Sequence, residues 1–114
     1  MSELRAMNEY QTLERRRLVT IVRAMLSGEL PFLEGAEQVL GIKSQLVGVA
    51  DRDPDFDVFV VIRSETDHFP LENQRHLWAP EALARLEPEM KSAEKWASSF
   101  APQACRNLID RFGC

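Results

Sequence analysis

Apolar residues in the first quarter of the chain recur at steps of three and four, which is the spacing of one face of an α-helix. The arginines of this segment fall at other positions, and Gly28 stands where a helix commonly ends. The pattern predicts an amphipathic helix from Glu3 to Ser27. Its apolar face is expected to contain Leu18, Ile21, Val22, Met25 and Leu26.

A second helix is predicted to begin near Pro31, because apolar residues follow it at helical spacing. Gly35 and Gly41 would either let a neighbouring helix approach closely or end this helix early. Residues 47–53 then form a loop. The inward positions of the helix are predicted to be Leu33, Ala36, Leu40 and, near its end, Leu46.

Most prolines of the chain mark predicted helix starts, since five of the six are followed within three residues by an acid. Proline at the first helical position loses no useful hydrogen bond, and an acid in the first turn faces the positive end of the helix dipole. Asp53 before Pro54 is in addition a good N-cap. The five predicted starts are Pro31, Pro54, Pro70, Pro80 and Pro88.

Two more helices are predicted after Pro80. The apolar stripe that begins at Leu83 keeps its helical steps across Pro88, which indicates one long helix kinked at that proline. A last helix follows Pro102. The stripe of the long helix consists of Leu83, Leu86, Met90, Ala93, Ala97 and Phe100, and that of the last helix of Cys105, Leu108, Ile109 and Phe112.

The segment from Phe56 to Ile62 is ambiguous, because its β-branched and aromatic residues favour a strand whereas the preceding Asp53 and Pro54 favour a helix start. We expect it to be buried in either form. A helix is favoured, because a lone strand would have no partner in the chain. The sequence therefore predicts an all-α fold, a compact bundle of about five helices in a single domain over residues 1–114. A short buried strand at Val58–Ile62 would make it α+β instead.

Composition and length agree with one globular domain, with 114 residues of which 45% are hydrophobic and 28% charged. No apolar run approaches the roughly 20 residues that span a bilayer, and the early Glu3 does not suit a secretory signal. These features predict a cytoplasmic protein without a membrane partner. Cys105 and Cys114 are accordingly expected to be reduced.

The net charge of −4 is concentrated in the middle of the chain, where residues 29–74 hold ten acids against three bases. Phosphates would be repelled by such a segment, which argues against nucleic acid as its direct partner. A basic partner is favoured instead.

Acids occupy every second position from Asp51 to Asp57, as at the start of a calcium loop. That loop requires glycine at its sixth position and glutamate at its twelfth, which here are Phe56 and Ile62. The acids are therefore interpreted as a helix cap and a solvated acidic loop, and no metal or other cofactor is predicted.

Potential chemistry is concentrated between residues 64 and 76. His68, Glu72 and His76 are spaced by four, the arrangement of some zinc sites, but Pro70 interrupts the helix that would align them. A small metal-dependent hydrolase is thus the alternative hypothesis, and no catalytic residue is assigned. Its residues would be Glu65, Asp67, His68, Glu72 and His76.

The favoured hypothesis is an acidic protein-binding module that neutralises or regulates a basic partner, such as a bacterial immunity protein against a toxin domain. Trp78 and Trp96 could anchor an interface, although their helical context favours the core. A homodimer is a further hypothesis. The predicted partner-binding residues are Asp51, Asp53, Asp55, Asp57, Glu65, Asp67 and Glu72.

Overall fold

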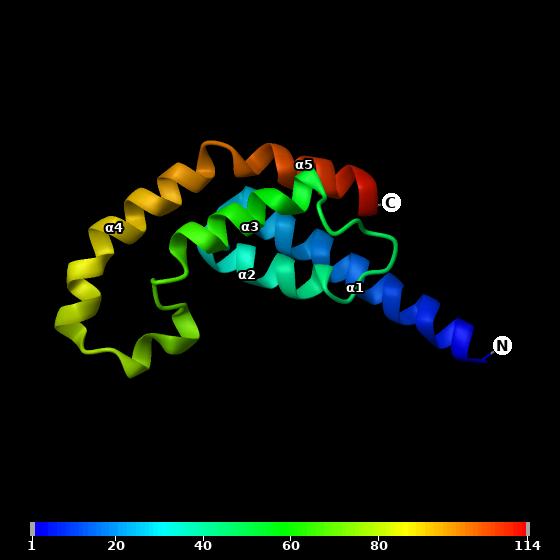
Figure 1. Ribbon diagram of the computed structural model, residues 1–114, viewed down its shortest axis with the longest axis horizontal. Helices are drawn as coiled ribbons and strands as arrows, with labels where there is room; N and C mark the ends of the chain where they lie inside the picture. The colour runs from blue at the N-terminus through cyan, green and yellow to red at the C-terminus, as the bar shows by residue number, and fades with distance from the viewer. Residues whose placement is uncertain (1, 114) are drawn as a thin grey trace.

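The computed structural model describes the backbone of residues 2–113 and the side chains of residues 8–113. All regular structure in this part of the chain is helical, as predicted, and the stretch Val58–Ile62 lies inside a helix rather than a strand. The elements are α1 (Ser2–Ser27), α2 (Phe32–Lys43), α3 (Pro54–Thr66), the 3₁₀ segment η1 (Glu72–Leu77), α4 (Pro80–Ser98) and α5 (Ala101–Phe112) (Figure 1).

The helix starts follow the local signals of the sequence. Asp53 caps α3 by accepting a hydrogen bond from the Asp55 backbone N–H at 3.1 Å, and Pro54 occupies the first helical position. Pro80 opens α4 in the same way. After α1, Gly28 adopts a φ of 84°, a left-handed conformation that suits glycine at a helix end.

Two of the predicted starts differ from the structure. Pro88 lies inside α4 and starts no helix, so the alternative interpretation of one helix running through it is confirmed. Pro70 precedes the short η1 segment and not an α-helix. A proline in a helix interior has no N–H to give to the carbonyl four residues earlier, which here belongs to Ala84.

The core lies between α1, α2, α3 and α5, and its largest fully buried side chains include Phe56 and Phe59 of α3. The expectation that the whole segment from Phe56 to Ile62 is buried holds for one face only. Val60 and Val61 are 40% and 46% exposed, because a helix turns successive residues through about 100°. Gly35 is buried within α2, where it permits the close approach of Met25 from α1.

Helix α4 joins this core only at its C-terminal end. Ala97 is its one residue that is buried, whereas Leu83, Leu86 and Met90 of the predicted apolar stripe stay partly exposed. Figure 1 shows α4 as an arch whose N-terminal half stands at the outer edge of the molecule. Among the described residues, no helix has both the length and the apolar character needed to cross a membrane.

Candidate functional site

The acids at the start of α3 are bound by residues of α5. Arg111 donates from both terminal nitrogens to the two carboxylate oxygens of Asp53, at 2.9 and 2.8 Å, and also to Asp55 at 2.9 Å. Asn107 donates to the other oxygen of Asp55 at 2.9 Å. These contacts lower the pKa of Asp53, mainly through the hydrogen bonds from Arg111, and raise the pKa of Arg111 in return. Both carboxylates thus hold α3 against α5.

The other two acids of this group differ from each other. Asp57 accepts a hydrogen bond from the Arg52 side chain at 3.0 Å, so its charge is also matched within the chain. Asp51 is exposed, and its backbone carbonyl accepts from the Lys43 ammonium at 2.8 Å. Three of the four predicted contact residues in the stretch 51–57 are therefore engaged in internal ion pairs.

The remaining predicted contact residues lie at the opposite end of α3. Glu65, Asp67 and Glu72 are exposed. The His68 ring lies 4.0 Å from the Asp67 carboxylate, and no lysine or arginine of the described residues pairs with any of the three acids. Helix α3 has 13 residues and is therefore about 20 Å long, which separates these three acids from those at its start. The seven acids form two groups, and we call Glu65, Asp67 and Glu72 the acidic border.

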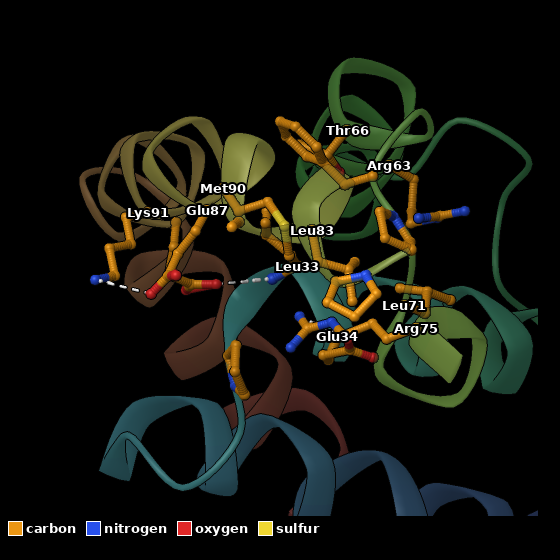
Figure 2. A pocket seen from close by; sticks show the side chains of 16 residues that line it. Leu33, Glu34, Arg63, Thr66, Leu71, Arg75, Leu83, Glu87, Met90 and Lys91 are labelled. Atoms are coloured by element: carbon orange, nitrogen blue, oxygen red, sulfur yellow. Dashed lines mark hydrogen bonds and ion pairs between the residues drawn. The ribbon is translucent and has the colours of Figure 1, made fainter. Parts of the chain in front are cut away.

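A pocket of about 570 Å³ lies between α2, the end of α3, the connection to η1, and α4. Its lining includes Thr66 and Leu71, which are chain neighbours of the acidic border, but none of the three acids themselves. Figure 2 shows α4 forming one of its walls and the α3–η1 region another. Ala84 and Pro80 in its lining are exposed, so the pocket opens to solvent. The apolar residues that line it are Pro31, Leu33, Phe69, Pro70, Leu71, Pro80, Leu83, Ala84 and Met90.

Each cation in the lining of the pocket has an acid of this chain as its neighbour. The ion pairs are Arg63 with Glu37 at 2.9 Å, Lys91 with Glu87 at 3.2 Å, and Arg75 with Glu34 at 3.9 Å. The distance between Arg75 and Glu34 is the longest of the three, so Arg75 is only weakly paired. Its Nε atom is buried without a hydrogen-bond partner in the described part of the chain, and a buried donor of that kind carries a desolvation penalty.

Glu94 fixes the position of α4 against α2. Its carboxylate accepts hydrogen bonds from the backbone N–H groups of Phe32 and Leu33, at 2.7 and 3.1 Å. The residue at the N-cap of α2 is Pro31, whose side chain makes no capping bond, so Glu94, which is 62 positions after Phe32, supplies the cap. This contact holds one wall of the pocket.

The residues of the hydrolase alternative are not aligned on one helix. His68 follows the end of α3, and its ring lies 4.0 Å from that of Phe69, whereas Glu72 and His76 belong to η1. Pro70 separates the two parts, as predicted. In the part of the chain that the structure describes, no group of three His, Cys, Asp or Glu residues is placed to hold a metal ion.

The expectation of buried tryptophans is wrong. Trp78 and Trp96 are 40% and 39% exposed, and Trp96 packs edge-on against Phe100 at 4.9 Å between ring centroids. Both belong to or adjoin α4, which covers too little of the core to bury large side chains on its own. Leu77, next to Trp78, is 76% exposed.

Cys105 is a free, buried thiol, as its helical pattern predicts. Burial raises its pKa to about 11, so it is protonated and a poor nucleophile near neutral pH. Cys114 lies outside the described residues. The reduced state of both cysteines stays a prediction.

Sequence reasoning missed the pocket and the residues that define it, above all Glu94 and Arg75. The apolar stripe from Leu83 to Met90 was the available signal, but it was interpreted as core. No family model, curated protein or solved structure matches the chain.

Proposed function

We propose that the chain is a protein-binding module that captures a basic partner, as an immunity protein captures a toxin domain. The observation that carries the proposal is the acidic border: three exposed carboxylates without a lysine or arginine partner among the described residues, next to a solvent-open apolar pocket. Apolar surface ringed by charge is the usual make-up of a protein interface.

The charge distribution supports a basic partner at this end of α3. The acids at the start of α3 already form ion pairs: Arg111 pairs with Asp53 and Asp55, and Arg52 pairs with Asp57. Their negative charges are therefore largely compensated within the chain. The acidic border has no such match and can attract cations from solution. Attraction of this kind raises the association rate and falls with added salt.

The seven predicted contact residues therefore take different roles in the proposal. Glu65, Asp67 and Glu72 make the direct contacts. Asp51, exposed at the other end of α3, adds to the long-range field. The partner-binding role of the acids held by Arg111 and Arg52 is secondary to their structural role.

The test is binding of the protein encoded by the adjacent gene, measured at about 50 and 200 mM salt. Reversing the acidic border with Glu65→Lys, Asp67→Lys and Glu72→Lys is expected to weaken the complex at least about tenfold and to flatten its salt dependence. The matched control carries Glu9→Lys, Glu89→Lys and Asp110→Lys, which change the net charge equally at exposed positions elsewhere. Equal affinities for the two triple variants would contradict the proposal. If the protein encoded by the adjacent gene does not bind, the specific hypothesis of an immunity protein is contradicted.

A further inference from the structure

We infer that the pocket beside the acidic border seats an amphipathic helix of the partner, with apolar side chains inserted and lysine or arginine side chains turned toward Glu65, Asp67 and Glu72. This inference rests on the proposed function and specifies the partner segment that it would recognise. Helices that lay an apolar face into a groove are a common mode of peptide recognition.

Part of the apolar face of α4 is not covered by the core. Leu83 and Met90 lie on one stripe of an amphipathic helix, yet both stay partly exposed because α4 reaches the core only near Ala97. Leu33 of α2 and Leu71 before η1 face the same pocket. A volume of about 570 Å³ lies within the range of roughly 300–1,000 Å³ that is typical of ligand pockets. Methionine adds a side chain that adapts to the shape of what it contacts.

The charges around the pocket favour a basic segment of the partner. Arg63 and Lys91 in the lining are paired with Glu37 and Glu87, so the pocket offers little free positive charge to an apolar acid. Arg75, 3.9 Å from Glu34, is the weakly paired cation of the lining, and the three carboxylates of the acidic border exceed it in charge. This combination favours a segment that is apolar on one side and basic on the other.

A helix end would satisfy a polar group in the wall of the pocket. The Nε atom of Arg75 is buried without an acceptor in the described structure, and the last turn of any α-helix carries carbonyl groups without an internal donor. The partner helix would accordingly place its C-terminal end near Arg75.

The probe is a synthetic 18-residue peptide with leucines at helical steps of three and four and lysines elsewhere, titrated by calorimetry into the full chain. Ala84→Trp fills the pocket from an exposed wall position, and Ser92→Trp is the matched control on the same helix outside the pocket. Circular dichroism checks that both variants stay folded. A second peptide with glutamate in place of lysine and a third with the same residues scrambled control for charge and for amphipathicity.

The wild type and Ser92→Trp are expected to bind the leucine–lysine peptide alike, and Ala84→Trp at least about tenfold more weakly. The glutamate and scrambled peptides should bind weakly or not at all. No binding of the leucine–lysine peptide, or equal binding by Ala84→Trp, would overturn the inference. Saturable binding of dodecanoate that Ala84→Trp blocks, without peptide binding, would also overturn it and identify a small-molecule pocket.

The reversed acidic border separates this inference from the proposed function. If the triple variant loses peptide affinity and Ala84→Trp does not, the basic partner stands and the pocket is not its seat. If Ala84→Trp loses affinity and the triple variant does not, the pocket is a helix site but the electrostatic basis of the proposed function fails. Loss of peptide affinity in both variants supports the proposed function and the helix site together.

Discussion

Arg111 near the end of α5 grips Asp53, the N-cap residue of α3, through two guanidinium nitrogens and both carboxylate oxygens at 2.9 and 2.8 Å. The same carboxylate accepts the Asp55 backbone N–H. One side chain therefore fixes the start of a helix and ties it to another element 58 residues away. A bidentate pair of this kind is among the stronger charged contacts in proteins.

Arg111→Ala is expected to lower the free energy of unfolding by about 1–2 kcal/mol, because it leaves the buried Asp53 carboxylate without its cation. The effect stays below that of a fully buried pair, since 37% of the Arg111 side chain is exposed and screened by solvent. Arg111→Lys should keep only part of this free energy, because an ammonium cannot reproduce the bidentate geometry of the guanidinium. Urea denaturation measures the change, with the exposed Arg106→Ala on the same helix as control.

The lowered pKa of Asp53 predicts a specific loss of stability in acid. Because the folded-state pKa lies below the unfolded one, the carboxylate contributes stability above the unfolded value, and this contribution disappears as pH falls through the folded value. Asp53→Asn keeps a capping side chain but removes the titration. The wild type should thus exceed Asp53→Asn in urea midpoint at pH 7, and the difference should shrink as pH falls below about 5. A constant difference down to pH 2 would contradict the assignment.

Glu94→Ala is expected to cost about 1 kcal/mol of stability, comparable to the loss of a helix cap, because the N–H groups of Phe32 and Leu33 lose their acceptor. Hydrogen exchange at these two amides should accelerate, and α4 should be held less firmly against α2. Glu89→Ala, an exposed change on the same helix, is the control. Unaltered exchange at both amides would show that the cap does not operate in solution.

Two glycines of α2 are expected to respond in opposite directions to alanine. A Cβ at Gly35 would clash with the thioether of buried Met25, so Gly35→Ala should destabilise by about 1–3 kcal/mol. A Cβ at Gly41 would meet open space, and Gly41→Ala should stabilise by roughly 0.5–1 kcal/mol through helix propensity. Thermal unfolding of the two variants compares them directly, and a shift of the same sign in both would contradict the packing.

The helix starts were predictable because their causes are local. Asp53 with Pro54, and Pro80 with the acid that follows it, carry the cap and first-turn chemistry in adjacent positions. Pro88 followed by Glu89 has the same local signature but lies inside α4. The continuing apolar steps around it, a longer-range pattern, gave the correct answer.

The site was predictable only in part. Its acids could be identified from their enrichment between residues 29 and 74, but their division into two groups depends on which of them meet Arg111 or Arg52 in the fold. The apolar stripe of α4 was visible as well. Whether that stripe enters the core or lines a pocket depends on where the helix packs, and residue spacing does not predict this.

The sequence by itself determined the helices, their main boundaries and most of the buried faces of α1 and α5, because periodicity, caps and prolines act over a few residues. In α2 it missed the buried Phe32, Val39 and Ile42. Tertiary structure alone decided that Glu94 caps α2 and that Arg111 pairs with Asp53. It also decided that Leu83 and Met90 stay partly exposed in the pocket. These outcomes depend on contacts between residues tens of positions apart. Such contacts follow from how whole helices pack, and so the candidate site was settled by the fold.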